Sequence, residues 1–381
     1  MTQPVRCRFP RATALLEQAV RDRVFPGCAF AVFDASDAQP SEKDAQAVGH
    51  FTYEPGSARV QPDTLFDLAS LTKVLATTAA VMLLYDRRQL ALDTPLADWL
   101  PEFASTHASD ERRARVTLRM LLDHSSGLPG YVRLFESTND RLAMIDACLR
   151  QPLTADPGMR AEYSDIGFMI LGYLVETITG ERLDAYCQRE IFAPLGMSAT
   201  RFCPEPALRA SIPPTEDDRS FRHRIVQGEV HDENASVMGG VAGHAGLFSN
   251  ALDPLRIAAC ILARGITPSG SKLFSTQAVE LFVQPAQQPP GTSRALGWDT
   301  PTPPSSSGKL FSPRSIGHLG FTGTSLWVDL DAGIAVSLLT NRTWPDRSNQ
   351  AIRELRPRFH DTLRSELAGD HKNRSGSTER T

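Results

Sequence analysis

The sequence is poor in lysine and has no long apolar segment. Five of its 381 residues are lysine, against 35 arginines. No stretch is long enough to span a membrane, and the N-terminus lacks the apolar core of a secretory signal. The net charge is −4 and no basic run occurs, which argues against nucleic-acid binding. We therefore expect a cytoplasmic protein with a small-molecule ligand and no membrane, nucleic-acid or obligate protein partner.

Several familiar motifs are also missing. The six cysteines are scattered without a C-x-x-C pair, which predicts free thiols. There is no Gly-x-Ser-x-Gly elbow, and the glycine-rich run 239–246 has neither Rossmann spacing nor a following Lys-Ser/Thr. His231-Asp232-Glu233 lacks a metal-binding spacing. We expect no cofactor and no metal.

The apolar pattern predicts helices at both ends of the chain, with strands next to them. Stripes of apolar residues indicate amphipathic helices, a long apolar run without Gly or Pro indicates a buried helix, and short apolar runs between turn residues indicate strands. The expected helices cover 11–24, 70–85, 165–179 and 347–367, and the expected strands cover 28–33, 47–53, 316–320, 325–329 and 334–340.

This order of elements predicts an α+β fold. Strands from both ends of the chain can join one antiparallel sheet of five strands, flanked by the N- and C-terminal helices. We expect residues 11–88 and 291–369 to form this discontinuous sheet domain. Residues 89–290 then form a mainly helical domain, and the polar tail 370–381 is expected to be disordered.

A Ser-x-x-Lys motif opens the long apolar helix. The motif occurs three times, at 70–73, 269–272 and 306–309, but the last two lie in Gly/Pro/Ser-rich stretches. Residues i and i+3 share one helix face, so the amine of Lys73 is expected near the hydroxyl of Ser70. A helix start also offers free N–H groups to a developing oxyanion. Without an acidic helical neighbour, Lys73 is expected to have a pKa lowered by burial, which would supply a neutral base.

One tyrosine is a candidate proton relay. Of the six tyrosines, Tyr163 alone is followed two residues later by Asn or Asp. A cation nearby can lower the pKa of a tyrosine, which suits proton transfer. Ser164 or Asp165 can also serve simply as the N-cap of the helix that follows, and both readings can hold together. His318-Leu319-Gly320, on an expected strand, is a third candidate element, although His-x-Gly also occurs at 244–246.

These motifs, in this order, resemble those of the superfamily of penicillin-binding proteins and class C β-lactamases. The likeness extends to Leu65–Lys73, Leu121–Leu128, Pro194–Met197 and His318–Trp327, and so covers roughly residues 25–345. It implies an antiparallel five-stranded sheet with a helical second domain and the site between them.

The resemblance also implies a role for each matching residue. Ser70 is the nucleophile, Lys73 its base, and Tyr163 the proton shuttle to the leaving group. The N–H groups of Ser70 and Phe321 form the oxyanion hole. Three residues are implied to contact substrate or line the cleft, namely Asp165, His318 and Gly320.

Two positions depart from the family pattern. Asp165 replaces an asparagine, and a carboxylate so close to Lys73 would raise the pKa of the lysine. His318 replaces a strand lysine that holds the substrate carboxylate. We expect a neutral His318 to bind carboxylates weakly and to gain charge as the pH falls toward about 6. Arg314 or Arg342 is an alternative source of the missing cation.

The sequence thus predicts a serine hydrolase that forms an acyl-enzyme on Ser70 and acts on a small ester or amide. Two alternatives stay open. The first is a D,D-carboxypeptidase or β-lactamase. The second is a non-catalytic penicillin-recognising sensor or interaction protein, although such a module has no chemical reason to keep Ser70, Lys73 and Tyr163 together.

Overall fold

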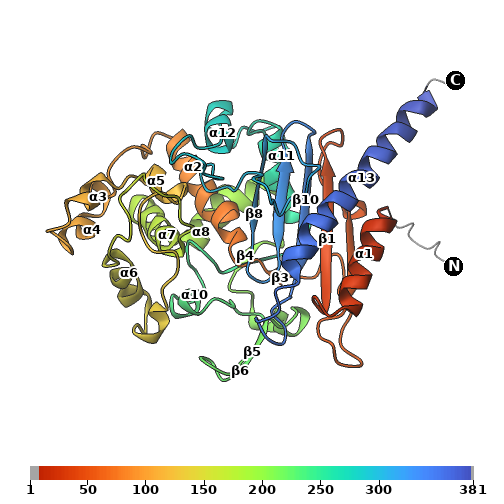
Figure 1. The fold of residues 1–381 in the computed structure, drawn as a ribbon, viewed down its shortest axis with the longest axis horizontal. Helices are drawn as coiled ribbons and strands as arrows, with labels where there is room; N and C mark the ends of the chain where they lie inside the picture. The colour runs from red at the N-terminus through yellow and green to blue at the C-terminus, as the bar shows by residue number, and fades with distance from the viewer. Residues whose placement is uncertain (1–7, 379–381) are drawn as a thin grey trace.

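The computed structural model describes residues 8–378, with side chains described as far as residue 369. Its centre is an antiparallel sheet of five strands in the order β2-β1-β10-β9-β8. Strands from the two ends of the chain meet where β1 pairs with β10. The expected five-stranded sheet is confirmed (Figure 1). The strands are β1 (Gly27–Asp34), β2 (Ala45–Gly49), β8 (Ser315–Leu319), β9 (Ser325–Asp329) and β10 (Ile334–Thr340).

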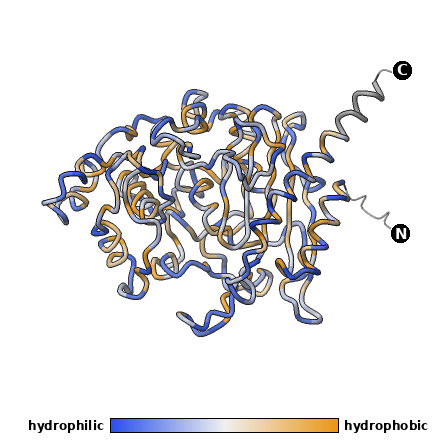
Figure 2. Tube along the Cα trace, viewed as in Figure 1, coloured by the Kyte–Doolittle hydropathy of each residue, from blue (hydrophilic) through white to orange (hydrophobic). Residues whose placement is uncertain are grey.

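The terminal helices cover one face of this sheet. Helices α1 (Pro10–Arg21) and α13 (Ile352–Thr378) contact each other and lie over the strands (Figure 1). The trace of α1 alternates between hydrophobic and hydrophilic colours, as an amphipathic helix should (Figure 2), and it buries Ala12, Leu16 and Ala19. The core beneath these helices includes Phe30 and Trp327 from the sheet.

The other face packs against the helical part of the chain. Helix α11 (Asp253–Leu262) contacts β1, β9 and β10, and one apolar cluster continues from there into the remaining helices. The proposed division at residues 89–290 stays a prediction. Helix α11 lies inside that range and packs on the sheet. The other helices are α2 (Ala79–Asp86), α3 (Leu96–Trp99), α4 (Pro101–Ser105), α5 (Leu118–Leu122), α6 (Arg141–Leu149), α7 (Asp165–Thr179), α8 (Leu183–Cys187), α9 (Ala193–Leu195), α10 (Glu233–Val237) and α12 (Thr276–Val283).

Two small sheets complete the fold. β3 (Phe66–Asp67), β7 (Leu247–Ser249) and β4 (Arg201–Phe202) form one, and β5 (Glu216–Asp218) pairs with β6 (Arg224–Val226) in the other. Within the described residues, no helix combines the length and the apolar character that crossing a membrane requires.

Several expected elements differ from the structure. The helix expected at 347–367 begins at Ile352. The strand expected at 47–53 ends at Gly49, whose φ of +81° turns the chain. The helix expected to run evenly from residue 70 contains a π-helical segment, Lys73–Thr78. Where we expected a disordered tail over 370–381, α13 continues through Thr378, and the last three residues lie outside the described part.

The close packing of β8 on β9 yields a stability prediction. A Cβ at Gly317 would lie 2.3 Å from the ring of Trp327, its partner across the two strands. Gly317→Ala should therefore lower the free energy of unfolding by about 1–3 kcal/mol through overpacking, as measured by denaturant titration. The control is Gly369→Ala in α13, where a Cβ meets nothing within 4 Å. Equal unfolding midpoints for the two variants would contradict this account of the packing.

Candidate active site

Ser70 lies in a strained turn between β3 and the buried helix. The preceding residue, Ala69, has a φ of +46°, which non-glycine residues rarely adopt. Asp67 stabilises this turn, because its Oδ1 accepts a hydrogen bond of 2.8 Å from the N–H of Ala69. The helical backbone begins at Leu71, so the expected placement of Ser70 at the start of the helix is confirmed.

The turn is also tied to the segment that joins β8 to β9. Thr322 donates from Oγ1 to the carbonyl of Asp67 at 2.8 Å, and Thr324 donates to the carbonyl of Leu68 at 3.0 Å. These two bonds fix the turn that carries Ser70 relative to the end of β8. The short side chains of Thr322 and Thr324 thus hold the backbone of the turn against the segment that follows β8.

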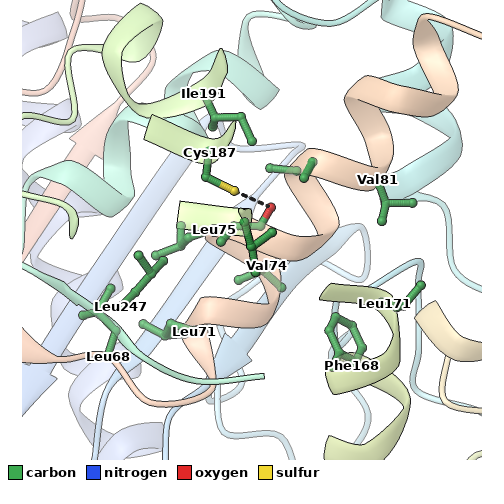
Figure 3. Close-up of a cluster of buried hydrophobic side chains, with 14 of the residues drawn as sticks. Leu68, Leu71, Val74, Leu75, Val81, Phe168, Leu171, Cys187, Ile191 and Leu247 are labelled. Atoms are coloured by element: carbon green, nitrogen blue, oxygen red, sulfur yellow. Dashed lines mark hydrogen bonds between the residues drawn. The ribbon is translucent and has the colours of Figure 1, made fainter. Parts of the chain in front are cut away.

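The helix after Ser70 is buried on all sides. Figure 3 shows Leu71, Val74 and Leu75 among apolar side chains that include Phe168 and Leu171 of α7. Every residue from 71 to 76 is buried, Lys73 included. This packing holds the side chain of Lys73, which points toward α7, in a fixed position.

Lys73 donates to three acceptors in this buried setting. Its Nζ lies 3.2 Å from Ser70 Oγ, 2.6 Å from Asp165 Oδ1 and 3.2 Å from the main-chain oxygen of His244. The side chain is 0% exposed. Burial is the largest single influence and disfavours the charged amine, but Asp165 and Tyr163 together outweigh it and raise the pKa of Lys73 above its ordinary value. The expected lowering by burial is therefore wrong, and the expected effect of Asp165 is confirmed.

Tyr163 lies beside this pair, with its ring centroid 4.7 Å from Lys73 Nζ. Burial raises the pKa of Tyr163, and the nearby Lys73, together with hydrogen bonds to Lys73 and Ser70, only partly offsets that effect. We expected a lowered pKa, and the direction is the opposite because burial is the larger cause. The phenol therefore keeps its proton at neutral pH and is able to donate it.

Helix α7 holds Asp165 in place. Ser164 is the N-cap, and its hydroxyl accepts the N–H of Gly167 at 3.0 Å. Asp165 is the first helical residue, and its carboxylate turns toward Lys73. Ser164 thus has the capping role that the sequence allowed, while Asp165 belongs to the site.

His318 lies near the end of β8 and is 3% exposed. Its Nδ1 lies 2.8 Å from the carbonyl oxygen of Leu319. Burial, together with the cations Lys73 and Arg294, lowers the pKa of His318 well below its ordinary value. The ring is therefore neutral at neutral pH, and the expectation that it gains charge as the pH falls toward about 6 is wrong.

The residues after His318 offer a backbone donor. A Cβ at Gly320 would lie 1.9 Å from Thr324 Oγ1 and 2.5 Å from the carbonyl of Leu68, so only glycine allows this close approach. Phe321 follows and is 46% exposed at the edge of the site. Within residues 8–378, the N–H groups of Ser70 and Phe321 donate to no protein acceptor, which leaves both available to an oxyanion.

Ser70, Tyr163 and His318 line a cavity of 400 Å³, which we call the cleft. Four arginines also line this cleft, and the sequence analysis named only Arg342 among them as a candidate cation. Arg314, one of the two proposed cations, is exposed and pairs with Asp331 at 3.1 Å instead. The four cleft arginines are Arg294, Arg342, Arg353 and Arg356.

Two of these arginines are buried without a carboxylate partner. Every hydrogen bond that the guanidinium groups of Arg342 and Arg356 make within the described residues goes to a backbone carbonyl. Burial, with other arginines nearby, lowers the pKa of Arg342 to about 10 and that of Arg356 to about 9. Both stay charged at neutral pH, so this end of the cleft is cationic although His318 is neutral.

Only part of this arrangement of arginines could be predicted from the sequence. Arg353 and Arg356 are three residues apart on α13 and so share one helix face. Arg294 sits in the irregular stretch before β8, where no periodicity marks it. Its guanidinium lies 5.6 Å from the ring centroid of Tyr163.

The acidic and histidine residues at 231–233 do not form a metal site. His231 pairs with Glu216 at 2.9 Å, Asp232 with His244 at 2.9 Å, and Glu233 with Arg347 at 2.7 Å. The three side chains thus point to different partners. Within the described part of the chain, no three or more His, Cys, Asp or Glu side chains gather as metal ligands would.

Comparison with known proteins places these features in a family. The sequence model of the Beta-lactamase family matches residues 12–357. An Escherichia coli (strain K12) protein named "Putative D-alanyl-D-alanine carboxypeptidase" is 33% identical over 308 residues, which cover 73% of this chain and 69% of that protein. An N-acetylmuramyl-L-alanine amidase of Bacillus subtilis (strain 168) is 33% identical over 310 residues, covering 75% of this chain and 69% of the relative.

Solved structures of low identity share the fold. Simvastatin synthase (LovD) from Aspergillus terreus superposes with a TM-score of 0.72 at 23% identity, covering 94% of this chain and 98% of that one. A class C β-lactamase from Rhodobacter sphaeroides superposes with a TM-score of 0.70 at 20% identity, covering 94% and 99%. The expected fold class is confirmed, and the chain belongs to the Beta-lactamase family.

Proposed function

We propose that the protein is a serine hydrolase that forms an acyl-enzyme on Ser70 and acts on a small ester or amide. The observation that carries the proposal is the contact of 3.2 Å between Lys73 Nζ and the Oγ of Ser70, which lines the cleft. Membership of the Beta-lactamase family and relatives named as a carboxypeptidase and an amidase support hydrolytic chemistry.

The proposed acylation moves one proton from Ser70 to the leaving group by way of Lys73 and Tyr163. Ser70 Oγ attacks the carbonyl carbon of the substrate and passes its proton to the neutral form of Lys73. The carbonyl π electrons move onto the oxygen, which the N–H groups of Ser70 and Phe321 stabilise. Tyr163 gives its proton to the leaving group as the bond to the carbonyl carbon breaks, and Lys73 returns a proton to Tyr163. Water then hydrolyses the ester on Ser70 by the reverse use of the same groups.

The first test is covalent labelling of the nucleophile. A fluorophosphonate should modify the wild type once and leave Ser70→Ala unmodified, as read by intact-protein mass spectrometry. Lys73→Ala should slow labelling about 10²–10⁴-fold, because the serine loses its base. Ser269→Ala, in a second Ser-x-x-Lys motif, is the matched control and should label like wild type. Labelling of Ser70→Ala at the wild-type rate would remove the proposal.

The ion pair between Lys73 and Asp165 predicts a pH effect. Asp165 raises the pKa of Lys73, and the lysine acts as a base only when it is deprotonated. Asp165→Asn should therefore lower that pKa and move the acid limb of kcat/KM to lower pH, by about 1–3 units. The measurement is ester hydrolysis between about pH 6 and about pH 10.

The control for this effect is Asp331→Asn, the same change at an exposed carboxylate that pairs with Arg314. Its profile should match that of the wild type. An acid limb that stays in place, or moves to higher pH, in Asp165→Asn would show that the carboxylate does not set the protonation of Lys73.

A second candidate is hydrolysis of a substrate that carries a carboxylate, as a D,D-carboxypeptidase or β-lactamase does. The cationic end of the cleft favours it, because Arg342 and Arg356 are buried there without a carboxylate partner among the described residues. This revises our expectation of weak carboxylate binding, which considered His318 and left Arg294, Arg353 and Arg356 out. The relative named as a carboxypeptidase agrees with this candidate.

Substrate comparison separates the two candidates. If the cleft holds a carboxylate, Arg294→Gln and Arg353→Gln should each lower kcat/KM for a D-Ala-D-Ala peptide or nitrocefin by about tenfold or more, because a charged hydrogen bond is lost. Hydrolysis of p-nitrophenyl butyrate, which is neutral, should change little. Arg314→Gln is the control outside the cleft. If the wild type prefers the neutral ester and the ratio is the same in all variants, the carboxylate candidate is excluded.

A further inference from the structure

The main-chain oxygen of His244 is one of the three acceptors around Lys73, at 3.2 Å. Residue 244 lies in the glycine-rich run 239–246. This run lies between α10 and β7 and has no regular secondary structure. The position of this oxygen therefore depends on what anchors the run, rather than on a helix or strand.

Two contacts anchor the residue before His244. Thr77 donates from Oγ1 to the carbonyl of Gly243 at 2.6 Å. A Cβ at Gly243 would lie 2.0 Å from the carbonyl of Phe168 and 2.9 Å from Gly172, so the backbone runs tightly against α7. The run is thus wedged between the helix that carries Lys73 and the helix that carries Asp165.

The ring of His244 supplies an anchor on the other side. It is 1% exposed, and its Nε2 lies 2.9 Å from Asp232 Oδ1. The same carboxylate oxygen caps α10 by accepting the N–H of Ala235 at 2.8 Å. Neither His244 nor Asp232 lines the cleft. Although burial alone would raise it, the pKa of Asp232 is held well below its ordinary value by His244, Ala235 and Lys73.

We propose that Asp232 and His244 form a positioning pair, which holds the main-chain oxygen of His244 against Lys73 and thereby aims the amine at Ser70. The inference rests on the proposed function, because it assigns a task in the same acylation step. The pair contacts neither the nucleophile nor the cleft, so its effect is on the rate of acylation rather than on substrate binding. The pair requires a hydrogen-bond donor at the position of His244 Nε2 and a hydrogen-bond acceptor on the side chain of residue 232.

The test measures acylation kinetics in four full-length variants. His244→Ala and Asp232→Ala should each lower kcat for ester hydrolysis, and the labelling rate of Ser70, about 10- to 100-fold, while KM stays within about twofold. His244→Gln keeps an N–H donor of similar reach and should recover most of the rate. The double variant should be no slower than the slower single variant, because one unit is lost in both.

His360→Ala is the control for burial alone. His360 is also fully buried, but it lies on α13 and packs against Phe311 and Phe359. This variant should lose stability in a thermal melt and yet label at the wild-type rate in its folded fraction. The positioning pair alone would be overturned if His244→Ala labelled as fast as the wild type, or if His244→Gln were as slow as His244→Ala. A wild type that does not label at Ser70 would overturn the proposed function and this inference with it.

Discussion

The ion pair between Lys73 and Asp165 joins the two helices on which the cleft depends. It links the segment after Ser70 to the first turn of α7 across 92 residues of sequence, with a separation of 2.6 Å between Nζ and Oδ1. Removing Asp165 would leave the fully buried charge of Lys73 without its carboxylate, which is far more costly than losing a surface contact. The amine that faces Ser70 is therefore placed by the same contact that holds the helices together.

The charges of the cleft are compensated unequally. Lys73 has a carboxylate within hydrogen-bond distance, whereas Arg342 and Arg356 have backbone carbonyls as their partners within the described residues. Carbonyl dipoles satisfy the N–H groups of a guanidinium without cancelling its charge. The positive potential of that end is thus directed into the cleft, where an anionic group of a substrate would meet it.

The sequence predicted those elements whose signals are local. The bounds of α7 are as expected, because Ser164 caps its start and Gly180 ends it in the left-handed conformation. The strands β9 and β10 also agree, since an apolar run between turn residues is enough to define a buried strand. The π-helical turns after Thr72 have no such signal, because an apolar run looks the same in either helix type.

The candidate site divides in the same way. Ser70 and Lys73 could be paired from their spacing on one helix. Tyr163 and His318 were candidates from their local patterns, and the resemblance of whole motifs gave them their roles. The cleft arginines could not be found together, because they come from three separated segments and meet only in the folded chain. Likewise, nothing local in the sequence connects Asp232 with His244, which are brought together by the path of an irregular run.

The two buried nitrogen bases near Ser70 show why residue type alone does not set charge. Lys73 is 0% exposed and His318 is 3% exposed, so burial disfavours the charged form of both. Lys73 nevertheless keeps its proton, because Asp165 is its partner. His318 stays neutral, because burial lowers its pKa and the neighbouring cations Lys73 and Arg294 lower it further. Burial acts in the same direction on both groups, and the sign of the neighbouring charge decides whether it is opposed or reinforced. Reasoning from the sequence succeeded where that neighbour could be named, as for Asp165, and failed where it could not, as for Arg294.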